Sequence, residues 1–375
     1  MKVLAYSIFI GILTLSGCFS SPPDNGEDEP SLHLLWEYAY DLDGGAPRVK
    51  PYLYTNMIIT SGDIKITALN YVTGEQVWKT PFDFTRQLLN SSFGVSNDVI
   101  TGSISDQVLA WNIETGESLW SVSFPDSLNF SHLSGITGSS DFFIAVGKGD
   151  NRIYKISQNG ELEIVQLDVR SYETSIYDGV LYASQRDGDP GVGVFTAYDV
   201  QTMEKIWRFE PGEFGFGTRE APIVENGIVY TGTTSGPSNS KNGFFALNAQ
   251  TGEELWRREG IFTYSAVLVD DYIYVNDAAG IYKLRKSDGG MEWYSDFEAG
   301  AGTAPIDYGY GYLYAPHSGT MHVVDAETGE IVYRLSPPDG SYFWKVTVGK
   351  GRVFAQSNRK LYAFAPWGYE EPISN

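Results

Sequence analysis

The chain has 375 residues, a formal net charge of -21 at pH 7 and a single cysteine. So large an excess of acidic groups makes nucleic acid and anionic lipid headgroups poor partners, because their phosphates repel it. One cysteine excludes a disulfide within the chain, so the fold must rest on packing and backbone pairing.

The first residues are typical of a lipoprotein signal peptide spanning 1–17. Lys2 supplies a positive start, residues 3–15 are apolar, and Leu15-Ser16-Gly17-Cys18 matches the bacterial lipobox, in which the cysteine is acylated. So short an apolar run does not favour a transmembrane helix. We expect 1–17 to be removed and lipid on Cys18, palmitate included, to anchor the protein to a membrane. Phe19, where Asp would favour inner-membrane retention, favours the outer membrane, facing the periplasm.

Residues 18–31 follow as the lipidated cysteine and an acidic stretch rich in proline. This stretch has no apolar periodicity, so we expect a flexible tether. An acidic run after a lipidated cysteine also leaves display at the cell surface open as an alternative.

From residue 32 to 366 one phrase recurs at intervals of about forty residues. It consists of an apolar strand, an Asn or Asp, a Thr-Gly-Glu turn and a closing aromatic, with the clearest copies at 66–78, 108–120 and 244–256. The turn glycines supply a positive φ, and the short polar side chains can bond the turn backbone. These residues are Gly74, Gly116, Gly252 and Gly329, with Asn70, Asn112, Asp199, Asn248 and Asp325.

A second hairpin precedes each phrase, marked by pairs such as Asp178-Gly179 and Asn226-Gly227 between apolar runs. Two hairpins per repeat predict the four-stranded blade of a β-propeller. The closing positions number eight, spaced 42, 42, 44, 43, 49, 37 and 40 residues apart, with Ile164 and Tyr333 as the departures from tryptophan. We expect the tryptophans to pack between neighbouring blades: Trp36, Trp78, Trp120, Trp207, Trp256 and Trp293.

The two ends of the repeat region complement each other. The last repeat stops after residues 361–365 without its turn and aromatic, whereas residues 32–36 form a closing strand without the three strands before it. Because pairing them would remove two exposed sheet edges, the N-terminal strand should complete the last blade. The prediction is an all-β fold, an eight-bladed propeller of four-stranded antiparallel blades over 32–366, with 367–375 as a C-terminal tail.

The phrase at 246–256, Ala-Leu-Asn-Ala-Gln-Thr-Gly-Glu-Glu-Leu-Trp, resembles the repeat of PQQ-like β-propellers. Eight blades behind a lipoprotein leader resemble the BamB-like lipoproteins of outer-membrane protein assembly. This resemblance implies a non-catalytic interaction scaffold whose partners are envelope proteins, among them a β-barrel assembly complex. Similar quinoprotein dehydrogenases are longer and carry an adjacent cysteine pair that this ring lacks, so no cofactor is expected.

Catalytic and metal motifs are missing from the sequence. His33, His132, His317 and His322 are scattered without metal-ligand spacing. Asp187-Gly188-Asp189 resembles a calcium loop but lacks further ligands at regular spacing, so we interpret it as a turn. We therefore predict no catalytic residue, no metal and no enzyme activity.

A binding function should lie on the loops. In each blade, the loop leading into the first strand and the loop joining the second and third strands emerge on one face. On that face 185–193 and 233–243 are long and rich in Gly, Pro, Ser and Asn, in neighbouring blades. This sector predicts the partner surface at Arg186, Asp187, Arg219 and Glu220, and non-repeating aromatics add Tyr264 and Trp344.

Two alternatives to the scaffold stay open. One is a PQQ- and calcium-dependent cofactor binder at the channel mouth, similar to the dehydrogenases. The other is a surface protein that binds glycan or polymer through Phe343, Trp344 and Tyr264, since aromatic rings at a rim suit sugar stacking.

Overall fold

The computed structural model describes residues 31–41, 49–61, 65–80, 93–104, 107–124, 133–147, 151–188, 191–215, 221–234, 241–277, 279–298 and 304–371. Ser31–Asn375 form one compact unit. Cys18, Arg219 and Glu220 lie outside the described residues.

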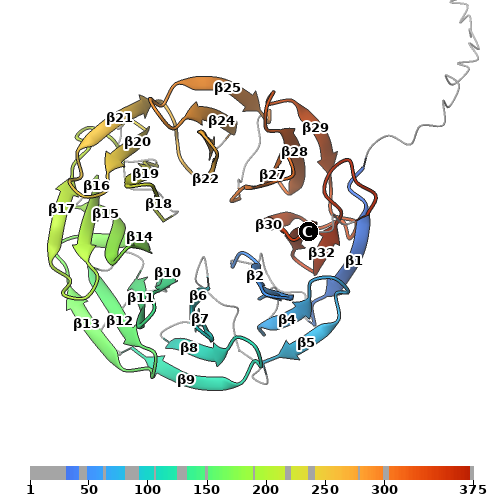
Figure 1. Cartoon of the computed structure of the whole chain (residues 1–375), viewed down its shortest axis with the longest axis horizontal. Helices are drawn as coiled ribbons and strands as arrows, with labels where there is room; N and C mark the ends of the chain where they lie inside the picture. Colours follow the sequence, from blue (N-terminus) through green and yellow to red (C-terminus); the bar gives the residue numbers. More distant parts are fainter. Residues whose placement is uncertain are drawn as a thin grey trace, which may run out of the picture. The chain divides into compact units, whose positions relative to one another are not determined.

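Eight four-stranded antiparallel sheets form a ring, which we number as blades in chain order (Figure 1). Blades 1 to 4 are β2(Tyr52–Tyr54), β3(Met57–Thr60), β4(Thr67–Asn70), β5(Gln76–Lys79); β6(Gly94–Ser96), β7(Val99–Ile104), β8(Gln107–Asn112), β9(Ser118–Ser123); β10(Leu133–Gly138), β11(Phe142–Gly147), β12(Arg152–Ser157), β13(Leu162–Gln166); and β14(Arg170–Tyr177), β15(Val180–Asp187), β16(Val192–Asp199), β17(Lys205–Phe209).

Blades 5 to 7 are β18(Ile223–Glu225), β19(Ile228–Gly232), β20(Gly243–Asn248), β21(Glu254–Glu259); β22(Ser265–Val269), β23(Tyr272–Asn276), β24(Gly280–Arg285), β25(Met291–Asp296); and β26(Asp307–Gly309), β27(Tyr312–His317), β28(Thr320–Asp325), β29(Ile331–Leu335). Blade 8 consists of β30(Phe343–Gly349), β31(Arg352–Ser357), β32(Lys360–Phe364) and, as its outer strand, β1(Leu34–Ala39).

The predicted closure is confirmed, because β1 pairs with β32 in antiparallel register from Leu34↔Phe364 to Ala39↔Lys360. The first strand of each blade lines the centre and the fourth forms the outer wall, as β14 and β17 do in Figure 1. The predicted eight-bladed all-β propeller is therefore confirmed, and the described residues include no helix.

The two faces of the ring differ in their connections. On the turn face lie the first-to-second strand hairpins and the turns of the repeated phrase. On the loop face lie the second-to-third strand connections and the connections between blades. Asp178 and Gly179 have φ of 48° and 74°, and Asn226 and Gly227 have φ of 50° and 76°, which confirms the predicted tight hairpin turns.

The phrase turns also form as predicted. The four turn glycines have φ between 72° and 79°. Asn112 Oδ1 accepts hydrogen bonds from the amides of Glu114 and Thr115 at 3.0 and 2.9 Å. Asn70, Asp199, Asn248 and Asp325 cap their turns in the same way.

The hydrophobic core lies between blades rather than within them. One buried cluster joins Ile59 and Trp78 of blade 1 to Ile100 and Trp111 of blade 2. Each sheet thus buries both faces against its neighbours, and the ring stays rigid enough to present loops from separate repeats at defined positions.

Candidate functional site at the junction of blades 4 and 5

Six of the eight joints between blades share one construction. The tryptophan on the outer strand of one blade lies over the turn glycine of the next, as Trp207 does over Gly252, where an added Cβ would come within 2.6 Å of the ring. Trp207 Nε1 donates a hydrogen bond to Ala249 O in that turn at 2.9 Å. The other tryptophan and glycine pairs are Trp36 and Gly74, Trp78 and Gly116, Trp120 and Gly160, Trp256 and Gly289, and Trp293 and Gly329.

Two joints depart from this construction. Between blades 3 and 4 the tryptophan position holds Ile164, which is 41% exposed, and the turn-glycine position holds Met203 at φ 59°. Between blades 7 and 8 the receiving turn does not exist, because blade 8 joins the two ends of the chain. There Tyr333 stacks on Trp367 with ring centroids 4.6 Å apart.

Three connections meet on the loop face where blade 4 borders blade 5. Gly193 N, at the start of β16, donates to Gly215 O at 3.1 Å, and Gly215 N donates to Lys241 O at 2.8 Å. Lys241 N in turn donates to Glu213 O at 3.1 Å, and Phe214 forms a parallel bridge with Lys241. Backbone hydrogen bonds therefore hold the segment after β17 between the hairpin of blade 4 and the connection of blade 5.

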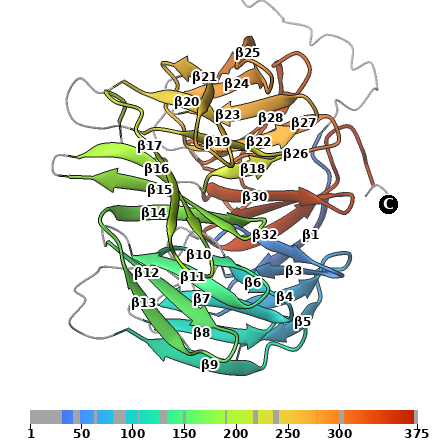
Figure 2. The same cartoon turned by 60° about the vertical axis from the view of Figure 1, so that its left-hand side comes forward.

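The predicted long loop at 185–193 is wrong. β15 continues to Asp187 and β16 begins at Val192, and these two residues pair directly. In the paired hairpin the backbone N–H and C=O groups of this stretch bond one another, which favours strands despite its polar composition. Gly188 and Gly191, at φ 77° and 81°, lie in the turn. The eight-residue strands make this hairpin longer than those of the other blades, and it lies at the left of Figure 2 beside β17.

The second long connection forms as predicted. β19 ends at Gly232 and β20 begins at Gly243. Thr233 N donates to Gly243 O at 2.8 Å, and Gly243 N donates back to Thr233 Oγ1 at 2.9 Å. This pair closes the base of the connection, so its length does not loosen the sheet below it.

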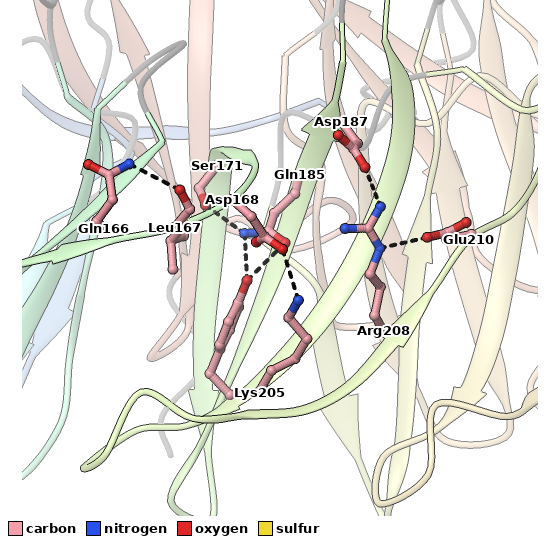
Figure 3. A network of polar contacts seen from close by, with 10 residues as sticks. Gln166, Leu167, Asp168, Ser171, Gln185, Asp187, Lys205, Arg208 and Glu210 are labelled. Carbon is pink, nitrogen blue, oxygen red and sulfur yellow. Dashed lines mark hydrogen bonds and ion pairs between the residues drawn. The ribbon is translucent and has the colours of Figure 1, made fainter.

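Asp187 lies in an ion-pair chain at the tip of blade 4 (Figure 3). Arg208 Nη2 lies 2.5 Å from Asp187 Oδ2, and Arg208 Nε lies 2.7 Å from Glu210 Oε1. Burial works to lower the pKa of Arg208, but hydrogen bonds and charge from the two carboxylates outweigh it and raise that pKa. The Asp187 carboxylate is 42% exposed, so it faces solvent while Arg208 holds it in place.

A buried network supports the hairpin from below (Figure 3). Gln185 is fully buried, and its Nε2 donates to Ser171 Oγ at 2.9 Å and to Tyr198 Oη at 3.2 Å. Arg186 follows with a half-buried side chain that lies against the backbone turn, since a Cβ on Gly191 would come within 2.5 Å of Arg186 Nε. The network fixes the direction in which the hairpin leaves the ring.

Charges continue from blade 4 onto blade 5. Lys241 Nζ pairs with Glu213 Oε1 at 2.7 Å and reaches Glu259 Oε2 at 3.5 Å. The guanidinium of Arg257 lies 5.2 Å from the centroid of the buried Phe214 ring. The junction thus presents alternating acidic and basic groups on a buried aromatic base, a pattern suited to a polar protein partner.

The predicted aromatic residues do not join this junction. Tyr264 is half-buried in blade 6, where its ring lies 5.2 Å from that of Phe262. Trp344 is half-buried in blade 8 and donates its indole N–H to Asn358. The interpretation of Phe343 as a sugar-stacking residue is wrong, because it is 2% exposed and packs on Tyr362 and Phe364.

Sequence reasoning also missed a histidine pair. The two-residue turn between β27 and β28 places the rings of His317 and His322 5.8 Å apart, each against Phe297. Burial lowers the pKa of His322 to about 4, and burial also lowers the pKa of His317. Among the described residues, no group of three His, Cys, Asp or Glu side chains could hold a metal ion.

The centre of the ring encloses a cavity of about 440 Å³, lined by the first strands of the blades. Its charged lining residues are Lys50, Glu173 and Lys345, and Lys50 Nζ pairs with Asp307 Oδ2 at 3.0 Å. In the part of the chain that the structure describes, no helix is long and apolar enough to cross a membrane.

Known proteins resemble this chain along most of its length. "Outer membrane protein assembly factor BamB" of Yersinia pestis is 24% identical over 326 residues, covering 80% of this chain and 79% of that protein. The protein of the same name from Shewanella oneidensis is 23% identical over 311 residues, covering 77% and 76%.

Two solved structures share the fold. The crystal structure of BamB from Moraxella catarrhalis has a TM-score of 0.70 at 16% identity and covers 89% of this chain and 100% of that chain. A computationally designed protein, Ika8, has a TM-score of 0.65 at 15% identity and covers 86% and 100%. At these identities the likeness concerns the fold alone.

The family comparison covers more than half of the sequence. The family described as "Outer membrane protein assembly factor BamB" matches residues 62–162, 105–259, 178–307 and 240–335. These segments contain the repeated phrases on which the predicted resemblance rested, and that prediction is confirmed. The chain belongs to the family of outer membrane protein assembly factor BamB.

Proposed function

We propose that this protein is a non-catalytic interaction scaffold in outer-membrane protein assembly. Membership of the BamB family supports this function, as do relatives of that name that match about four fifths of the chain. Its partners in this proposal are envelope proteins of an assembly complex, and it works from the outer membrane, facing the periplasm.

The proposed anchor is lipid on Cys18 after removal of residues 1–17, with 18–31 as tether and 32–366 as the propeller. The lipobox sequence supports this arrangement. Mass spectrometry of protein from its native host should find an acylated N-terminal Cys18, and Cys18→Ser should release the protein from membranes. Protein that stays on membranes after this change would contradict the anchor.

The proposed partner surface is the junction of blades 4 and 5 with Arg186, Asp187, Arg219 and Glu220. The observation that carries it is the backbone bonding of Gly193, Gly215 and Lys241, which fastens connections from two blades into one supported surface. Pre-organised polar groups lose little conformational freedom on binding, so such a surface suits specific recognition. Tyr264 and Trp344 lie apart from this junction, at the starts of the first strands of blades 6 and 8, and we propose them as separate contact points on the same face.

The test compares this surface with the opposite face. Arg219→Ala combined with Glu220→Ala should leave folding intact but reduce the capture of envelope proteins in cross-linked cells at least tenfold. Glu117→Ala, an exposed substitution on the turn face, serves as control and should capture the same partners as the unaltered protein. Equal capture by the double variant would refute this surface, and normal outer-membrane protein levels in cells lacking the gene would refute the assembly function.

The absence of catalysis is part of the proposal and has its own test. The names of the relatives, which describe assembly factors, support it. Purified protein incubated with PQQ and calcium should acquire no dye-linked dehydrogenase activity. Activity above that of heat-denatured protein would favour the cofactor-binding alternative.

A further inference from the structure

Blade 8 departs from the other blades at one repeat-equivalent position on the turn face. The residue that opens the second strand is apolar or aromatic in seven blades and arginine in blade 8, at Arg352. The seven are Met57, Val99, Phe142, Val180, Ile228, Tyr272 and Tyr312. Two residues earlier stands Lys350, at φ 52°, where the other blades have neutral or acidic residues.

Arg352 is buried, and no carboxylate of the described residues pairs with it. It is 6% exposed, and within this part of the chain its Nε has no hydrogen-bond partner and Nη1 donates only to the carbonyl of Lys350 at 3.2 Å. The guanidinium lies 5.1 Å from the centroid of the Tyr71 ring, across the joint between blades 8 and 1. Burial lowers the pKa of Arg352.

Lys350 has the same surroundings. Its ammonium lies 5.2 Å from the Tyr71 ring centroid and donates to the carbonyl of Thr55. Within the described ranges it forms no ion pair with an acidic side chain. By contrast, Arg208, Arg257 and Arg285 each pair with acidic side chains.

This pair of cations is unusual in so acidic a protein. The net charge is -21, and the phrase turns on the same face carry exposed Glu75 and Glu117. Holding a guanidinium away from water and from carboxylates costs free energy that an apolar residue, as in the other blades, would avoid. An incoming carboxylate would recover part of this cost, since charge-assisted hydrogen bonds to arginine are among the stronger ones.

We propose that Arg352 and Lys350, with the ring of Tyr71, form a binding point for a single carboxylate of a partner protein on the turn face. Nη2 of Arg352, which bonds none of the described residues, and the Lys350 ammonium supply the donors. The planar guanidinium matches a planar carboxylate. The binding point lies on the face opposite the proposed assembly surface, so either stands without the other.

The test uses the full mature chain and follows the backbone amide signals of Gly351 and Tyr71 by NMR. Sodium acetate, inorganic phosphate and sodium chloride are titrated at constant ionic strength. Acetate should shift both amides and saturate. Lys350→Met should weaken the acetate affinity several-fold, and Arg352→Met should abolish saturation while the protein stays folded, because blade 1 has Met57 at the equivalent position. Lys205→Met removes a cation that is already paired with Asp168 and should change nothing.

Each contrary result is informative. Shifts that do not saturate, or that chloride reproduces, would overturn the binding point and leave Arg352 as a packing residue. Tighter binding of phosphate than of acetate would overturn the assignment of the ligand as a carboxylate. Acetate saturation that survives Arg352→Met would place the anion elsewhere.

Discussion

The joint between blades 4 and 5 and the joint between blades 3 and 4 lie on opposite faces of the same sheet but are built differently. At the first, Trp207 lies over Gly252 and bonds the turn carbonyl of Ala249. At the second, Ile164 and Met203 occupy the two equivalent positions. Tryptophan and glycine are thus present together or absent together, because a ring can lie on the turn only where no Cβ intervenes.

The joint between blades 3 and 4 has another donor in place of the indole N–H. Lys155 Nζ donates to Gln201 O in the turn at 2.9 Å, so a lysine supplies the hydrogen bond that a tryptophan supplies elsewhere. Its ammonium also lies 4.4 Å from the centroid of the Phe142 ring. At the seven joints that have a receiving turn, a side chain donates a hydrogen bond to a turn carbonyl, and in six of them this side chain is tryptophan.

The largest effect should come from the indole itself. Trp207→Ala removes a side chain that is 8% exposed, together with its hydrogen bond, and should lower the free energy of unfolding by about 4 kcal/mol. Ile164 occupies the equivalent position but is 41% exposed, so Ile164→Ala should lower the free energy of unfolding by less than about 1 kcal/mol. Denaturant titration of both variants measures the difference, and equal costs would remove the distinction between the joints.

The glycine under the ring should come next. Gly252→Ala adds a Cβ that would lie 2.6 Å from Trp207 at φ 72°, so a clash adds to left-handed strain and the cost should be about 3 kcal/mol. Gly227→Ala is the matched control, since φ is 76° there and nothing lies within 4 Å. It should cost about 1 kcal/mol. If the two variants unfolded at the same denaturant concentration, ring contact would not explain the glycine.

Introducing the tryptophan and glycine pair at the joint between blades 3 and 4 should change the stability by a smaller amount. Ile164→Trp together with Met203→Gly should stabilise the protein by about 1 kcal/mol more than the sum of the single changes, because each residue of the pair needs the other. A double-mutant cycle of unfolding free energies measures this coupling. Additive values would mean that Lys155 already satisfies the joint.

The smallest effect should distinguish the turn caps by pH. A backbone hydrogen bond from Thr202, with others, lowers the pKa of the Asp199 carboxyl, so the folded turn favours the ionised form. This contribution is present above the unfolded carboxyl's pKa of about 3.9 and is lost as the pH falls through the lower folded value. Asn248 caps its turn without titrating.

Amide hydrogen exchange compares the two turns. Met203 N bonds Asp199 O and Gly252 N bonds Asn248 O, both at 2.8 Å. Protection of the Met203 amide relative to the Gly252 amide should decline below pH 4, and Asp199→Asn should abolish the decline. A constant ratio in the unaltered protein would show that the charge of Asp199 does not stabilise its turn.

How far the sequence could predict the site depended on whether a residue repeats. Turn glycines, capping residues and closing aromatics recur, so each copy supports the interpretation of the others. Gln185 to Gly193 occurs once, and its polar, glycine-rich composition suggested a loop where the structure has a paired hairpin. His317 and His322 looked scattered because only the short turn between β27 and β28 brings their rings together.

The sequence by itself determined the period, the blade, the number of blades and the closure by the N-terminal strand. Local turn chemistry and strand alternation encode these features, and eight copies reinforce them. Only the tertiary structure decided that Gly193, Gly215 and Lys241 bond one another and that Arg352 reaches Tyr71 across the joint between blades 8 and 1. Such contacts join residues far apart in the chain, and they depend on how the ring brings its blades side by side, which no local pattern records.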